Sequence, residues 1–196
     1  MAGPGRAIRG SLVSDMALIL VRHGPTEWNE APVELVRGKV DVPLLPKAKA
    51  LIRATAEQIK ARGRPVLSVA SDDLSRSKTT AEIIGQTVGA PTYVDCDLEP
   101  WDIGKMAGQF KPEIIDTIRY YVENPDKQPP DGEPYMDFYR RWARRFNSGR
   151  RMTNGDADIV WVVHSSNFHA LPSIMAGGEP EYDEEKQPAP ASMMVL

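Results

Sequence analysis

The chain has 196 residues, 41% of them hydrophobic and 26% charged, with a formal net charge of −3. This length suits one domain that buries roughly 70% of the surface of its unfolded chain, and the charge favours no polyanionic partner. One cysteine excludes an intrachain disulfide and fits a reducing compartment. No apolar stretch approaches the about 20 residues of a membrane span. We therefore expect a cytoplasmic protein without a membrane or nucleic-acid partner.

The N-terminal segment differs in composition from the rest of the chain. Residues 1–15 are rich in Gly, Ala and Ser and lack the apolar central region of a signal peptide. We expect a disordered extension over 1–15 and a folded domain over 16–196, and Met16 is an alternative natural start.

Strand and helix patterns alternate along the domain. Buried apolar runs predict strands, and charged positions spaced around apolar ones predict amphipathic helices. The expected strands are 17–22, 65–70, 92–95, 159–163 and 191–196. The expected helices are 47–62, 76–88, 112–123, 134–147 and 166–176. Such alternation predicts an α/β fold, a three-layer α/β/α sandwich around a mostly parallel sheet.

Two histidines follow predicted strands in the same way. His23 comes after the strand 17–22 and His164 after the strand 159–163. The carboxyl ends of parallel strands share one edge, where ligands of open α/β sheets bind. Arg22 precedes the first histidine, and Arg76 begins the helix after the second strand. The sequence therefore predicts two histidines and two arginines in one pocket.

These residue types together indicate phosphate chemistry. A guanidinium matches phosphate oxygens in a bidentate way, and a neutral imidazole nitrogen can attack phosphorus. A single histidine at a strand end is more often an ordinary polar residue, and a single arginine at a helix start is usually a solvated charge. Packing of the core does not require two histidines and two arginines at the same edge of the sheet, so we favour the phosphate pocket.

Several segments resemble one known family. The segment Arg22–Asn29 reads RHGPTEWN and is similar to the signature of the histidine phosphatase superfamily, the phosphoglycerate mutase-like enzymes. The stretches SVASDDLSRSKTTAEII and VWVVHSSNFHAL resemble the strands and following helices that carry the second arginine and the second histidine of that family. PPDGEPYMDFYRRW is similar to a helix start in its small phosphatase branch.

The resemblance implies a role for each matching residue. His23 matches the nucleophile that becomes a phosphohistidine. Arg22, Arg76 and His164 match groups that bind the phosphoryl oxygens. Thr26 and Asn29 match positions that approach the phosphate from the following loop. The implied reaction is metal-independent hydrolysis of a small phosphorylated substrate, with no cofactor.

The sequence departs from the family pattern at the general acid. Members commonly carry glutamate four residues before a glycine, and Pro100 occupies that place before Gly104. Glu99 lies one residue earlier, and Asp102 matches a later acidic position. Either carboxylate is a candidate acid, and we favour Asp102 slightly. Loss of a general acid typically costs about 10²–10⁴-fold in rate.

Polar residues follow the second histidine where the family often has glycines. Ser165 and its neighbours could donate hydrogen bonds to phosphate or could cap the following helix, and both interpretations stay open. His169 is interpreted as a helix-surface or core residue. Cys96 is interpreted as a small, partly buried strand residue and not as a nucleophile.

Two charge clusters occur late in the chain. Arginines dominate 140–151 and acidic residues dominate 179–185. We interpret both as solvated faces that partly neutralise each other.

Two other functions compete with the phosphatase prediction. One is phosphoglycerate mutase-type transfer, which needs lid segments that keep water away. The other is a non-enzymatic phosphate-binding module that lacks a working acid. Substrate specificity is expected from the loops around 28–46 and 101–135, and the residues indicate neither the substrate nor the oligomeric state.

Overall fold

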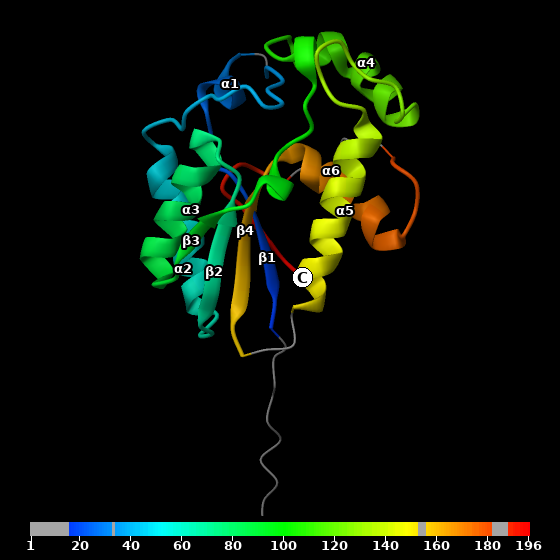
Figure 1. The fold of residues 1–196 in the computed structure, drawn as a ribbon. Coiled ribbons are helices and arrows are strands. Elements are labelled where there is room, and N and C mark those ends of the chain that lie inside the picture. Colours follow the sequence, from blue (N-terminus) through cyan, green and yellow to red (C-terminus); the bar gives the residue numbers. More distant parts are fainter. Residues whose placement is uncertain (1–15, 33, 153–155, 182–187) are drawn as a thin grey trace, which may run out of the picture.

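The computed structural model describes residues 16–32, 34–152, 156–181 and 188–196. Its centre is a five-stranded sheet in the order β3-β2-β4-β1-β5 (Figure 1). All neighbouring strands run parallel except β5, which is antiparallel to β1. The strands are β1 (Leu18–Arg22), β2 (Val66–Ser71), β3 (Thr92–Val94), β4 (Asp158–Val163) and β5 (Met193–Val195). The prediction of a mostly parallel sheet is confirmed.

Helices cover both faces of this sheet. Figure 1 shows α2 and α3 on one side and α5 and α6 on the other, with α1 and α4 beyond the upper edge. The helices are α1 (Glu27–Glu30), α2 (Ala48–Ala61), α3 (Ser75–Val88), α4 (Lys111–Glu123), α5 (Tyr135–Arg151) and α6 (Ser165–Ala176). Two short 3₁₀ helices, η1 (Cys96–Leu98) and η2 (Gly104–Met106), lie between β3 and α4. The three-layer α/β/α architecture is confirmed.

The side chains of β1 alternate between two hydrophobic cores. Leu18 and Leu20 belong to the core under α5 and α6, whereas Ile19 and Val21 belong to the core under α2 and α3. Successive strand residues point to opposite faces, and helices cover both faces, so every residue of β1 is buried. The continuous apolar run of β1 follows from this burial.

Close contact between α5 and β4 requires a glycine. A Cβ atom on Gly149 would lie 2.1 Å from Cη2 of Trp161. The guanidinium of Arg145 covers the same indole ring, 4.0 Å from its centroid. The aromatic side chains of α5 therefore pack directly on the sheet.

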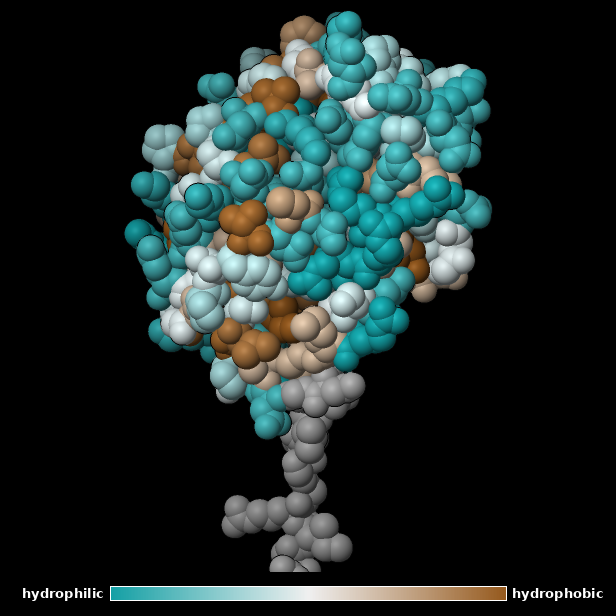
Figure 2. Space-filling view, viewed as in Figure 1, coloured by the Kyte–Doolittle hydropathy of each residue, from teal (hydrophilic) through white to brown (hydrophobic). Residues whose placement is uncertain are grey.

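The arginines of α5 bind partners other than the late acidic segment. Arg141 pairs with Glu133 at 2.8 Å, and Arg145 pairs with Asp95 at 2.6 Å. Figure 2 shows the most hydrophilic colour over the region of α5 and separate hydrophobic patches elsewhere on this face. Residues 182–185 of the acidic segment lie outside the described residues. The expected neutralisation between the two clusters is wrong for Arg141 and Arg145, because acidic groups packed against α5 lie nearer.

Some smaller expectations differ from the structure, and one concerns residues that the structure does not describe. Cys96 lies in η1 and is exposed, so its expected place on a partly buried strand is wrong. β3 ends at Val94, one residue before the expected end at 95, because Asp95 accepts a hydrogen bond from the backbone N–H of Asp97 and starts the 3₁₀ turn. The segment 1–15, expected to be disordered, lies outside the described residues. None of the helices in the described part of the chain is long and apolar enough to cross a membrane.

The sheet delivers three polar residues to one edge. β1, β4 and β2 are parallel neighbours, and their carboxyl ends lead directly to His23, His164 and Asp72. All three side chains are buried. This edge faces α1 and α4 in Figure 1 and holds the candidate site.

Candidate active site

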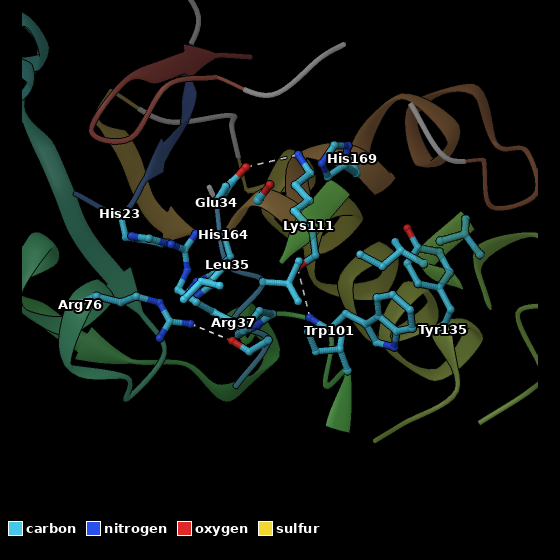
Figure 3. A pocket seen from close by; sticks show the side chains of 18 residues that line it. His23, Glu34, Leu35, Arg37, Arg76, Trp101, Lys111, Tyr135, His164 and His169 are labelled. Atoms are coloured by element: carbon cyan, nitrogen blue, oxygen red, sulfur yellow. Dashed lines mark hydrogen bonds and ion pairs between the residues drawn. The ribbon is translucent and has the colours of Figure 1, made fainter. Parts of the chain in front are cut away.

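A cavity of about 110 Å³ lies beyond the carboxyl edge of the sheet (Figure 3). One end is basic, and the other is formed by apolar side chains. The basic end contains His23, Arg37, Arg76 and His164. The apolar lining includes Leu35, Val36, Trp101, Ile103, Ile118, Val122 and Tyr135. The cavity therefore offers a place for an anionic group next to a place for an organic group.

The ring of His23 is held in one tautomer. Its Nδ1 lies 2.7 Å from the carbonyl oxygen of Gly24. A carbonyl oxygen only accepts hydrogen bonds, so Nδ1 carries the proton and Nε2 of the neutral ring keeps its lone pair. Burial, followed by the charges of His164, Arg37, Arg76 and Arg22, lowers the pKa of His23 well below 6.5. His23 is therefore neutral at physiological pH, and the lone pair of its Nε2 is available.

The close fit of Gly24 explains how this carbonyl is placed. A Cβ atom at Gly24 would lie 2.7 Å from Cδ1 of Ile52 in α2. The backbone N–H of Gly24 donates to the hydroxyl of Thr80 in α3 at 3.1 Å. The turn after β1 is thus fixed against both helices of one face.

Arg76 and Arg37 supply the positive charge of the cavity. Arg76 is fully buried and donates to the carbonyl oxygens of Val40 at 2.7 Å and Gly38 at 2.9 Å. Burial lowers the pKa of Arg76 to about 10. Burial, with the nearby charges of Arg22 and Arg76, lowers the pKa of Arg37 to about 9. Both guanidiniums remain charged at pH 7, and an anion between them would relieve their mutual repulsion.

Arg22 lies beside the cavity and is not one of its lining residues. Its Nη1 donates to the carbonyl oxygen of Pro188 at 2.8 Å, and its Nη2 lies 3.9 Å from Oε1 of Glu34. Its charge still acts on the cavity, because it contributes to the lowered pKa of His23.

His164 forms a buried pair with Asp72. The ring Nε2 donates to Oδ2 of Asp72, and the centroid of the ring is 5.0 Å from that of His23. Burial raises the pKa of Asp72, but the attraction of His164 and hydrogen bonds from His164, Ser77 and Leu74 outweigh it and leave this pKa below 3.8. Burial lowers the pKa of His164, and Asp72 opposes this shift. The pair is therefore a carboxylate beside a neutral imidazole.

Thr26 and Asn29 bind each other and do not line the cavity. Oδ1 of Asn29 accepts from the backbone N–H of Thr26 and from its hydroxyl, both at 3.1 Å. Arg37 donates to the hydroxyl of Thr26 at 3.1 Å. The structure thus places Thr26 as a support of Arg37, and the amide of Asn29 caps α1.

The two candidate acids of the sequence, Glu99 and Asp102, both lie outside the cavity lining. Oε2 of Glu99 pairs with Nζ of Lys39 at 2.5 Å. Oδ1 of Asp102 accepts from the backbone N–H of Gly104 at 3.0 Å and so helps to form η2. Neither carboxylate is brought next to His23 in this structure.

The residues after His164 include a helix cap and two serines that line the cavity. Asn167 accepts from the backbone N–H of His164 at 3.1 Å and caps α6. Ser165 and Ser166 line the cavity, and the hydroxyl of Ser166 also accepts from the backbone N–H of Trp101 at 3.1 Å. His169 is buried, as a core residue would be, yet it also lines the cavity, because it lies one turn after Ser165 on the same face of α6.

Sequence reasoning missed Arg37, Asp72 and Glu34, of which the first and the last line the cavity. Asp72 follows β2 as His23 follows β1, so the rule applied to the histidines applies to it as well. Arg37 and Glu34 come from the loop after α1 and carry no comparable signal. This loop and the segment around α4, from which substrate specificity is expected, both line the cavity. In the described part of the chain, no group of three or more His, Cys, Asp or Glu side chains is placed to hold a metal ion.

Comparison with known proteins identifies the family. The model of the histidine phosphatase superfamily (branch 1) matches residues 18–196. The uncharacterized phosphatase PhoE of Bacillus subtilis is 30% identical over 168 residues, which are 84% of this chain and 80% of PhoE. The probable phosphoglycerate mutase GpmB of Cronobacter sakazakii is 28% identical over 180 residues, 87% of this chain and 79% of GpmB.

A solved structure shares the fold. The crystal structure of a phosphoglycerate mutase from Thermus thermophilus superposes with a TM-score of 0.66 at 26% identity, and the match covers 92% of each chain. The family model spans the sheet, the helices and both strand-end histidines. The chain therefore belongs to the histidine phosphatase superfamily (branch 1).

Proposed function

We propose that this protein is a metal-independent phosphatase that hydrolyses a small phosphomonoester through a phosphohistidine on His23. The observation that carries the proposal is the hydrogen bond from Nδ1 of His23 to the carbonyl oxygen of Gly24. This bond leaves the lone pair of Nε2 available in a cavity whose nearest charges are arginines. A phosphoryl group is the substrate that this combination fits best.

The reaction has two steps. In the first, Nε2 of His23 forms a bond to phosphorus, and the bond between phosphorus and the ester oxygen breaks. In the second, water attacks phosphorus, the P–N bond breaks, and inorganic phosphate leaves. The carbonyl of Gly24 keeps the proton of Nδ1 in place throughout.

The charge of the phosphoryl group is met by the basic end of the cavity. Arg37 and Arg76 line it, and His164 contributes its ring beside His23. Hydrogen bonds to charged groups contribute about 1.5–3 kcal/mol each. These groups are positioned before the substrate arrives, so they stabilise the charge of the transition state without reorganisation.

The test is phosphate release from p-nitrophenyl phosphate in buffer with a chelator. His23→Ala is expected to lose turnover while its melting temperature stays close to that of the native protein. The native protein should also yield a phosphorylated species that is stable in alkali and labile in acid, as a phosphohistidine is. An active His23→Ala variant would overturn the proposal.

Two alternatives have specific support. The name of the relative GpmB favours a mutase, which would isomerise phosphoglycerate without releasing phosphate. The positions of Glu99 and Asp102 outside the cavity favour a binding module, which would bind inorganic phosphate without turnover of any ester. Measuring isomerisation, release and phosphate binding on the same preparation separates the three functions.

A further inference from the structure

The phosphatase reaction proposed above needs a proton donor that the sequence pattern does not supply. A leaving alkoxide must take up a proton as its bond to phosphorus breaks. Glu99 and Asp102 are engaged elsewhere, with Lys39 and with the backbone of Gly104. Among the described residues that line the cavity, the one carboxylate is that of Glu34.

The position of Glu34 is fixed by its backbone and by two cations. Its carbonyl oxygen accepts from the backbone N–H of Lys111 at 2.8 Å, which ties the loop after α1 to the start of α4. Its Oε1 lies 3.9 Å from Nη2 of Arg22, and its Oε2 lies 3.4 Å from Nζ of Lys111. Figure 3 shows the carboxylate reaching toward Lys111 in the same cavity as His23.

We propose that Glu34 is the general acid and base of this enzyme. As the bond from His23 to phosphorus forms and the ester bond breaks, the carboxyl group of Glu34 gives its proton to the leaving oxygen, and the product alcohol departs. In the second step the resulting carboxylate takes a proton from the attacking water, and phosphate is released from His23. Both residues then return to their starting states.

The surroundings of Glu34 suit this cycle. After the proton has left, Lys111 and Arg22 stabilise the carboxylate. Glu34 keeps about a third of its exposure, 35%, so water can reach it for the second step.

The choice of ester gives a sharp test. A 2,4-dinitrophenolate leaves without protonation, whereas the oxygen of an alkyl or phenyl phosphate needs a proton. Glu34→Gln is expected to reduce kcat/KM on phenyl phosphate by about 10²–10⁴-fold, and on 2,4-dinitrophenyl phosphate by a much smaller factor. A merely structural role would reduce both rates equally, because loss of the ion pairs does not depend on the leaving group.

Three further variants control the experiment. Glu30→Gln makes the same chemical change in the neighbouring helix α1, where Glu30 pairs with Lys47 outside the cavity lining. Glu99→Gln and Asp102→Asn test the two rival acids. The ratio of the two ester rates is expected to change only in Glu34→Gln. Equal losses on both esters in Glu34→Gln, or an ester-dependent loss in Glu99→Gln or Asp102→Asn, would overturn the assignment.

Thermal unfolding identifies a folding defect. If Glu34→Gln melts far below the native protein, Glu34→Asp keeps the carboxyl group and is expected to retain the native ratio of ester rates. Failure of the Glu34 proposal can also be told apart from failure of the phosphatase proposal. Activity that is lost in His23→Ala but insensitive to the ester in Glu34→Gln would remove Glu34 as the acid and leave the phosphohistidine mechanism standing.

Discussion

The carboxylate of Asp72 accepts a hydrogen bond from Nε2 of His164, and the pair is buried at the edge of the sheet where β2 and β4 end. Asp72 also accepts from the backbone N–H of Leu74 at 2.9 Å, which fixes the carboxylate at the start of α3. The ring of His164 is therefore oriented by the strand next to its own. In the proposed reaction, Asp72 is a positioning residue that acts through His164.

Asp72→Asn should lower kcat more than it raises KM. A hydrogen bond to a charged group is worth about 1.5–3 kcal/mol, which corresponds to roughly 10–150-fold in rate. The negative charge of Asp72 raises the pKa of His164 against the effect of burial, so its removal should also lower the pKa of His164 and move the limb of the pH–rate profile that reports this histidine to lower pH. Asp73→Asn, at the exposed neighbouring residue, is the control. An unchanged profile in Asp72→Asn would contradict the positioning role.

Arg37 is expected to bind the phosphoryl group, although the sequence pattern did not single it out. Arg37→Gln should weaken inhibition by inorganic phosphate by roughly 10-fold or more, because a charged hydrogen bond is lost. The measurement is the inhibition constant of phosphate for the native protein and the variant. Arg53→Gln, on the exposed face of α2, removes the same charge far from the cavity and should leave the constant unchanged. Equal inhibition of both variants would exclude Arg37 from the site.

Buried neutral histidines make the stability of the fold sensitive to acid. The pKa of His23 is lowered well below 6.5 by burial and by His164 and the arginines. Below about pH 6.5, His23 therefore binds a proton in the unfolded chain but stays unprotonated in the folded protein. Its contribution to the free energy of unfolding is complete above that pH and is lost as the pH falls below it. The free energy of unfolding should decrease by about 1.4 kcal/mol per pH unit for this residue. Denaturant unfolding between pH 7 and pH 5 measures the slope.

His23→Asn isolates the contribution of this residue. The variant should show a slope shallower by about one proton, while His164, whose pKa is also lowered by burial, keeps its own contribution. A slope identical to that of the native protein would mean that His23 titrates normally in the folded state.

Gly38 connects the backbone to the arginine cluster. Its φ of 51° lies in the left-handed region, and an added Cβ would lie 2.7 Å from Cγ1 of Ile103. Its carbonyl oxygen also accepts from Nη2 of Arg76. Gly38→Ala should therefore reduce both the stability and the phosphatase rate, since Arg76 shifts with the loop.

Gly63→Ala is the matched control for this change. Gly63 has a φ of 69°, with no heavy atom within 4 Å of an added Cβ. It should lose about 1–2 kcal/mol of stability from backbone strain alone and keep its activity. Melting temperatures and steady-state rates of the two variants give the comparison. Equal rates in both variants would show that the Gly38 carbonyl does not hold Arg76.

The sequence by itself determined the layers of the fold and the position of the two histidines at one edge of the sheet. Buried strands in a parallel sheet carry unbroken apolar runs, and the runs before His23 and His164 are of this kind, so the pattern also predicts that both residues reach one edge. Arg76 follows from the same argument, because the helix after the second strand begins at that edge. Local periodicity and short-range order are sufficient for these conclusions.

Only the tertiary structure decided which charged groups enter the cavity. Glu99 and Asp102 lie in a segment of 3₁₀ turns, where a rotation of one residue redirects a side chain. Lys39, distant in the sequence, pairs with Glu99, and the backbone of Gly104 binds Asp102, so both carboxylates stay outside the cavity lining. Glu34 and Arg37 come from a loop whose path depends on two contacts. The backbone of Glu34 binds that of Lys111, which is distant in the sequence, and Arg37 binds Thr26, to which no sequence pattern links it. Long-range packing, and not local sequence, sets the direction of loop side chains, so the acid could be sought only once the fold was known.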